Sequence, residues 1–139
     1  MADPFRLQRF VDAQAPVFDE VRAELRAGRK RGHWMWFVFP QISGLGASPT
    51  ADRYAVSSLA EAEAYLAHPL LGPRLRECTE LVRAIEGRAV REIFGYPDDL
   101  KFRSSMTLFA HATHDSTLFT EAIGKYFPDG FDPLTLERL

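Results

Sequence analysis

Apolar residues recur at helical spacing through the first part of the chain. The clearest set lies three and four residues apart and comprises Val17, Phe18, Val21 and Leu25. Pro16 suits the first turn of this helix, and Gly28 is placed to end it. The residues from Phe5 to Val11 repeat the pattern over a shorter length. We therefore predict two helices here, separated near Pro16.

From residue 58 onward, proline and glycine divide the apolar pattern into further helices. Ser58 and Glu61 have the spacing of a capping box, and the helix that they begin is expected to end at Pro69. An apolar stripe from Leu70 to Ile85 predicts the next helix. The segment "RAVREIFG" predicts a short helix that Gly95 ends.

The last third of the chain predicts three more helices. The first starts at residues 97–99 and carries an apolar face of three residues: Phe102, Met106 and Phe109. The second runs through the segment from Leu118 to Phe127. Asp132 is expected to cap a final short helix that has Pro133 in its first turn.

The most hydrophobic stretch, "WMWFVFP" at residues 34–40, has the character of either a strand or a helix. Its bulky aromatic and branched side chains are typical of a buried strand. A strand needs a partner for its backbone hydrogen bonds, and no other segment has a strand pattern. We therefore predict a buried helix or helical turn, apolar on all sides, that ends at Pro40. The whole chain is then a single all-α domain over residues 1–139, a compact bundle of about six to eight short helices.

Composition and charge agree with an ordinary folded domain. Of the 139 residues, 46% are hydrophobic and 26% are charged, unlike a disordered chain. The net charge is −2, so we expect neither nucleic acid nor a membrane as a partner. No apolar run is long enough to cross a bilayer, and the N-terminus has no secretory pattern. We therefore expect a soluble protein. Cys78 is the single cysteine, which excludes an intrachain disulfide and fits a cytoplasmic location.

Four long segments of the chain together resemble a known family. They are "GRKRGHWMWFVFPQISGLGAS", "AEAYLAHPLLGPRL", "IFGYPDDLKFRSSMTLF" and "DPLTLERL". The family is the bacterial domain of unknown function 1810, and the resemblance covers nearly the whole chain. It implies a compact, mainly helical single domain, and it implies no reaction. Some members carry the label calpastatin, but a flexible protease inhibitor would not need so many aromatic residues or a succession of capped helices.

Polar residues interrupt the apolar pattern at the start of the helix after residue 97. Lys101, Ser104 and Ser105 lie at spacings of three and four, about one turn after Asp98 and Asp99. An ammonium and two hydroxyls at one place can bind a phosphate, a ribose or a carboxylate. The alternative is structural. In that case the aspartates complement the helix N-terminus, one of them pairs with Lys101, and the serines bond to the helix backbone.

A second polar cluster lies between residues 30 and 48. Its candidate binding residues are Lys30, His33, Trp34, Trp36, Gln41 and Ser48. The tryptophans can stack on a base or a sugar, or they can be core residues. His33 is either a general acid or base, or a histidine at the edge of the core that bonds to a carbonyl. The turn "SGLGASPT" leads to an expected helix start at Ser48, where free amides can bind an anion, but it lacks the dinucleotide fingerprint.

We expect the two clusters to form one polar cleft that binds a small anionic or nucleotide-like molecule. A catalytic alternative is hydrolysis of a glycosidic bond in a nucleotide derivative. It would use Asp98 or Asp99 as general base or electrostatic stabiliser, His33 as proton carrier, and Lys101 with the serines on the phosphate. A third alternative is a noncatalytic module that binds a protein through exposed aromatic residues. No metal or cofactor is expected, because no other cluster of ligands completes the set in "HATHDS".

Overall fold

The structure is built from helices joined by short loops. The computed structural model describes residues 2–139 and contains ten helices over that range, six of which have seven or more residues. In chain order they are α1 (Gln8–Gln14), α2 (Phe18–Arg26), α3 (Met35–Val38), α4 (Pro49–Tyr54), α5 (Leu59–Ala67), α6 (Leu71–Arg83), α7 (Val90–Phe94), α8 (Asp98–His111), α9 (Thr117–Tyr126) and α10 (Pro133–Leu136). The predicted all-α fold is confirmed. The described residues contain no β-strand.

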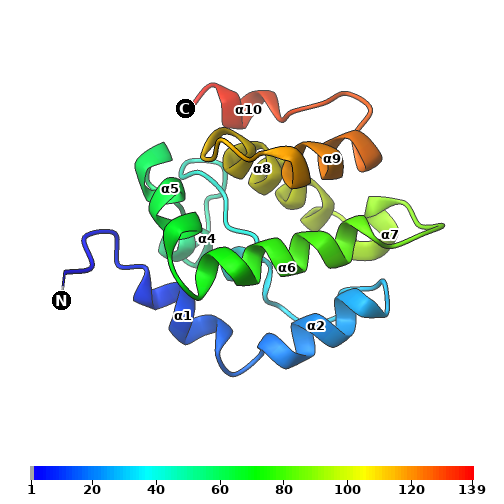
Figure 1. Ribbon diagram of the computed structural model, residues 1–139, viewed down its shortest axis with the longest axis horizontal. Helices are drawn as coiled ribbons and strands as arrows, with labels where there is room; N and C mark the ends of the chain where they lie inside the picture. Colours follow the sequence, from blue (N-terminus) through cyan, green and yellow to red (C-terminus); the bar gives the residue numbers. More distant parts are fainter. Residues whose placement is uncertain (1) are drawn as a thin grey trace.

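Helix α8 is the centre of the fold. It packs against α5, α7, α9 and α10, and α6 packs against α2, α5 and α9 on the other side of the core (Figure 1). The side chains of Phe102 and of all residues from 104 to 110 on α8 are buried. Residues 104–110 of α8 have no solvent face, so their polar side chains need partners inside the protein. The first turns of α8 remain partly open, and Leu100 there is 47% exposed.

The hydrophobic stretch at residues 34–40 forms the single helical turn α3, as predicted. Phe39, which follows α3, is fully buried and packs edge-on against Phe102, with ring centres 5.1 Å apart. The prediction that this turn is buried on all sides is wrong, because the side chains of Trp36 and Phe37 are only half-buried. The six residues of α4 pack beside α3 and are too few to cover both rings. Trp36 is therefore left open toward solvent.

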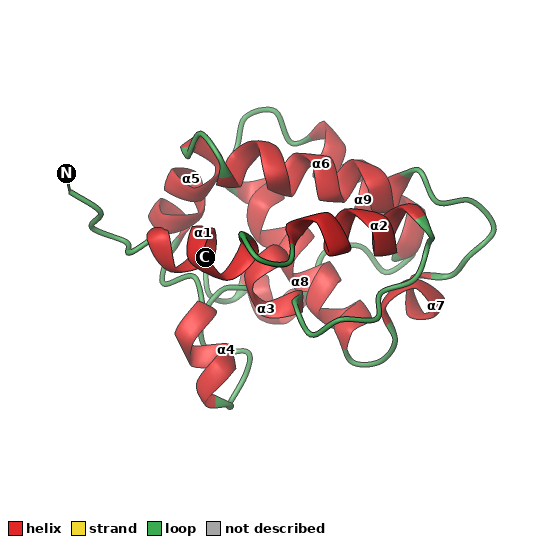
Figure 2. Cartoon of the chain, turned by 90° about the horizontal axis from the view of Figure 1, so that it is seen from below, coloured by secondary structure: helices red, strands yellow, loops and turns green. Residues whose placement is uncertain are grey.

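A parallel bridge closes the loop that follows α3. The Ser43 N–H donates to the Val56 carbonyl at 2.8 Å, and the Val56 N–H donates to the Gln41 carbonyl at 2.8 Å. Residues 41–56 thus form a loop with a fixed base. The loop carries α4, which projects from the body of the molecule in Figure 2.

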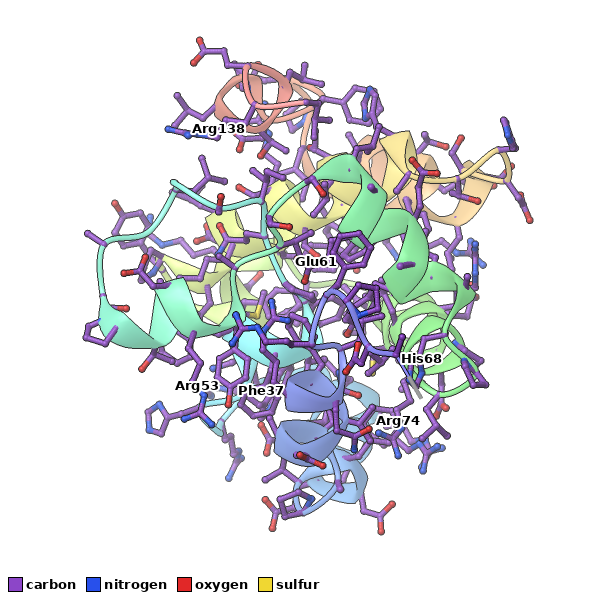
Figure 3. All side chains as sticks on the ribbon, turned by 90° about the vertical axis from the view of Figure 1, so that its left-hand side faces the viewer. Phe37, Arg53, Glu61, His68, Arg74 and Arg138 are labelled. Atoms are coloured by element: carbon purple, nitrogen blue, oxygen red, sulfur yellow. The ribbon has the colours of Figure 1, made fainter. Side chains whose placement is uncertain are left out.

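The C-terminal segment connects α8 with this loop. Arg103 on α8 donates from Nε to the Gly130 carbonyl at 2.8 Å and from Nη2 to the Phe131 carbonyl at 3.0 Å. Beyond α10, the Arg138 guanidinium lies so close to Gly44, which has a φ of +94°, that a Cβ there would overlap it. Figure 3 shows Arg138 on the C-terminal segment facing the loop. The space between α8 and the loop is therefore closed at one end by the C-terminus.

Candidate functional site

A cleft of about 430 Å³ lies between the loop after α3, the N-terminal half of α8 and the start of α10. The loop side contributes Trp36, Gln41 and Leu45, together with Gly46 and Ala51. Helix α8 and the residue before it contribute Pro97, Leu100, Lys101, Arg103 and Ser104, and the C-terminal segment contributes Asp132 and Leu134. A second, much smaller cavity of about 20 Å³ shares Trp36, Gln41, Gly46 and Ala51 with the cleft. Trp36 thus lines both cavities.

Lys101 is held between a carboxylate and an aromatic ring. Its ammonium lies 3.1 Å from Asp98 Oδ1 and 4.4 Å from the centre of the Trp36 ring. The second oxygen of Asp98, Oδ2, lies 2.9 Å from the ammonium of Lys30. Because one carboxylate faces two ammonium groups, this cluster retains one positive charge at the edge of the cleft.

The loop that carries Lys30 is fixed to two helices. Its backbone N–H donates to the Ile93 carbonyl of α7 at 2.7 Å. Glu24 of α2 accepts through Oε1 from three groups, which are Arg31 N, Gly32 N and Trp34 Nε1, at 2.5, 2.8 and 3.1 Å. Burial raises the pKa of the Glu24 carboxyl, but these N–H donors and the charge of Lys30 outweigh it, so this pKa lies below its ordinary value. These contacts therefore hold Lys30 in a fixed position beside Asp98.

The opposite wall of the cleft contains a hydroxyl–carboxylate network. Asp132 Oδ2 accepts from Ser104 Oγ at 2.9 Å and from Thr135 Oγ1 at 2.6 Å. The Asp132 N–H donates to Thr107 Oγ1 at 3.0 Å. Asp132 occupies the N-cap position of α10, but its side chain makes no capping hydrogen bond. The prediction that Asp132 caps this helix is therefore corrected: the carboxylate instead accepts hydrogen bonds from the hydroxyls of Ser104 and Thr135.

Comparison with known proteins identifies the family of this chain. Residues 4–139 match the family described as "Protein of unknown function (DUF1810)". The chain belongs to the DUF1810 family. The crystal structure of the conserved hypothetical protein Rv1873 from Mycobacterium tuberculosis is similar to this DUF1810 protein, with 63% sequence identity and a TM-score of 0.96. The similarity covers 97% of this chain and 96% of that one. No curated protein matches the chain.

The two polar clusters predicted from the sequence meet at the cleft of the DUF1810 protein, although only part of each lines it. The predicted residues in its wall are Trp36, Gln41, Lys101 and Ser104. Lys30 and Asp98 lie directly behind Lys101 through the ion pairs described above. That these residues bind a ligand stays a prediction.

The other five predicted residues of the DUF1810 protein do not line the cleft. Trp34 is a core residue with 2% of its surface exposed, and His33 is exposed on the neighbouring loop. Ser48 caps α4, since its Oγ accepts from Ala51 N at 3.0 Å. Asp99 and Ser105 are buried on α8, where Asp99 Oδ1 and Ser105 Oγ have no hydrogen-bond partner among the described residues.

Two polar residues of the DUF1810 cleft were missed in the sequence. Arg103 and Asp132 line it, but the spacing from Lys101 to the serines passes over Arg103, and Asp132 precedes a proline and was interpreted only as a helix cap. The contact between Ser104 and Asp132 joins residues 28 positions apart, and no periodicity in the chain predicts it. Within residues 2–139, no group of three or more His, Cys, Asp or Glu side chains is placed to hold a metal. The same range contains no helix long and apolar enough to span a bilayer.

Proposed function

We propose that this DUF1810 protein binds a small anionic, nucleotide-like molecule in the cleft between α8 and the loop after α3. The observation that carries the proposal is the position of Lys101, whose ammonium is fixed against the Trp36 ring at the cleft wall. A cation and an aromatic ring side by side match a ligand that carries a negative charge and a flat ring.

The size and the lining of the cleft support such a ligand. A volume of about 430 Å³ falls in the range of small-molecule sites, roughly 300–1,000 Å³. Trp36, Leu100 and Leu134 provide apolar surface for a ring, and the polar side chains are few, as in typical ligand pockets. Lys101 and Arg103 add two positive charges to the lining against one negative charge, that of Asp132. This balance favours an anionic group on the ligand.

The hydrolase alternative receives less support from the same geometry. Both oxygens of Asp98 are engaged by lysines, and neither His33 nor Asp99 lines the cleft. A general base must lie within hydrogen-bond reach of the proton that it takes, directly or through one water. The carboxylate in the wall of the cleft is that of Asp132 instead. We therefore propose binding as the function and assign no catalytic residue.

The interaction-module alternative is also less favoured. Leu100 and Leu134 are exposed by 47% and 59%, but both line the cleft, where a small molecule fits better than a flat protein surface. We place the binding activity in the cytoplasm, which agrees with a single, buried cysteine that forms no disulfide.

The proposal is tested by thermal shift and titration calorimetry with nucleoside monophosphates, ADP-ribose, sugar phosphates and small carboxylates. A ligand at one hundred times its dissociation constant adds about 2.7 kcal/mol of stability, which raises Tm by roughly 8 °C or more in a domain of this size. Lys101→Met should weaken binding at least about tenfold, the effect of losing one charge-assisted contact. Lys125→Met is the matched control: its side chain is 30% exposed against 23% for Lys101, and it lies outside the cleft on α9.

Two results would contradict the proposal. The first is the absence of a shift with every ligand class. The second is a ligand that binds the wild type and Lys101→Met equally, since its site would then lie elsewhere. The first result would favour a protein partner that contacts the exposed leucines of the cleft.

A further inference from the structure

Asp132 is the only acidic residue among those that line the cleft in the described part of the chain. A carboxylate is an unexpected group in a site that favours an anion, because it repels the ligand unless it makes a specific contact. Its side chain makes no capping bond to α10, and its bonds to the hydroxyls of Ser104 and Thr135 use Oδ2 alone. The role of the other oxygen, Oδ1, therefore needs a separate explanation.

We propose that Asp132 determines specificity by accepting hydrogen bonds from a pair of neighbouring sugar hydroxyls on the ligand. This inference rests on the proposed function, because it assigns a role within the same cleft. A carboxylate oxygen accepts well from a hydroxyl. Each such oxygen has two lone pairs, so a single oxygen can accept hydrogen bonds from two adjacent hydroxyls. The ligand class that it selects is a phosphorylated sugar or nucleotide with an intact vicinal diol.

The geometry leaves one oxygen of Asp132 for a ligand. Oδ2 is occupied by the hydroxyls of Ser104 and Thr135, whereas Oδ1 makes no hydrogen bond to any residue between 2 and 139. Both hydroxyl donors are more than nine-tenths buried, so they hold the carboxylate plane in one orientation. The backbone bond to Thr107 fixes the same residue from behind. A preorganised acceptor of this kind discriminates well, because a ligand without the donor leaves it unpaired.

The charges around Asp132 favour a neutral donor over a cationic one. Lys101 and Arg103 line the same cleft and would repel an ammonium group on the ligand. A sugar hydroxyl avoids that repulsion and still supplies the proton. The anionic group of the ligand is then expected at Lys101, and the diol at Asp132, on the wall formed by the C-terminal segment.

The test compares AMP, GMP and UMP with their 2′,3′-dideoxy counterparts by titration calorimetry on the full chain. We expect the wild type to prefer at least one ribonucleotide over its dideoxy form by about tenfold or more. Asp132→Asn should reduce that preference to about threefold or less while phosphate binding at Lys101 persists. Asp129→Asn is the matched control, because Asp129 is exposed three residues earlier and lies outside the cleft.

The results distinguish the role of Asp132 from the proposed binding of an anion. Equal binding of the ribo and dideoxy forms by the wild type overturns the role of Asp132 and leaves anion binding intact. A preference that survives Asp132→Asn overturns it as well. If neither a nucleotide nor a sugar phosphate binds while another small anion does, the diol assignment fails but anion binding stands, whereas no binding by any ligand refutes both. The wild-type comparison needs no variant, so the inference stays falsifiable if Asp132→Asn does not fold.

Discussion

Ser104 and Ser105 are adjacent on α8 and are expected to respond to alanine substitution with opposite signs. Ser104 Oγ lies 3.1 Å from the Leu100 carbonyl and 2.9 Å from Asp132 Oδ2, so its hydroxyl can be shared between two acceptors. Ser105 is completely buried, and its Oγ has no partner among the described residues. The same chemical group is therefore hydrogen-bonded at position 104 and left without a partner at position 105.

The expected magnitudes follow from these contacts. Ser105→Ala removes a buried unpaired hydroxyl, whose desolvation costs about 1–3 kcal/mol, and gains up to about 0.7 kcal/mol of helix propensity. The small void loses several contacts of about 0.1–0.2 kcal/mol each. We expect a net stabilisation of about 1–2 kcal/mol. Ser104→Ala loses a hydrogen bond to a carboxylate, about 1.5–3 kcal/mol, against the same propensity gain, so it should destabilise by about 1–2 kcal/mol.

Urea unfolding followed by circular dichroism measures both variants, and calorimetry gives their Tm. In a domain of this size, 1 kcal/mol corresponds to roughly 4 °C, so the two Tm values should lie about 8–16 °C apart. The denaturant slope should stay unchanged in both, because neither substitution alters the surface exposed on unfolding. Equal destabilisation of the two variants would refute the reasoning, since it would show that Ser105 has a bonding partner after all.

Three other substitutions or treatments test separate parts of the structure. The pKa of Glu24 is lowered in the folded protein, so its charge stabilises the fold above its unfolded pKa of about 4.5 and loses this effect as the pH falls. The difference in the free energy of unfolding between wild type and Glu24→Gln, measured by urea titration, should therefore shrink below that pH. Gly72→Ala should cost about 2–4 kcal/mol, because its Cβ would overlap the Leu66 carbonyl oxygen, whereas Gly124→Ala meets no atom within 4 Å and should stabilise by about 0.5–1 kcal/mol. Burial raises the pKa of the Cys78 thiol to about 12, so a thiol reagent at pH 8 should label it only after unfolding, and rapid labelling of the native protein would contradict this.

Local signals in the sequence were sufficient for most of the helices. The stop at Gly95, with a φ of +77°, and the side-chain cap of α5 by Ser58, which accepts from Glu61 N, both appear where the residue types predicted them. These features depend on neighbours within four residues and on the conformational freedom of glycine. The Glu61 side chain departs from the expected capping box, since it bonds to Ser57 and Arg9 instead of the N-cap amide. Oε1 of Glu61 accepts from Ser57, one residue before the N-cap, and Oε2 accepts from Arg9 of the distant helix α1.

The candidate site was predictable only in outline, because its geometry depends on contacts distant in sequence. Spacing along α8 indicated that Lys101 and Ser104 share a region of the helix, and both line the cleft. The same spacing also selected Ser105, which turns into the core and lies outside the cleft. Residues 104–110 of α8 are buried on every side and give no amphipathic pattern from which to choose between neighbouring positions. The wall that contains Asp132 belongs to the C-terminal segment, whose place beside α8 is set by tertiary packing.

The ion pair between Lys30 and Asp98 connects the stability of the fold to the chemistry of the cleft. The Lys30 side chain is only 8% exposed, and burying such a pair gives little or no net stability compared with apolar residues of similar size. Its effect on Lys101 is different in kind, because a carboxylate fixed by Lys30 holds the Lys101 ammonium against Trp36. Without the second lysine, Asp98 would neutralise Lys101 completely; with it, the three groups keep one positive charge. The proposed binding of an anion thus gives the buried lysine a role that stability alone does not.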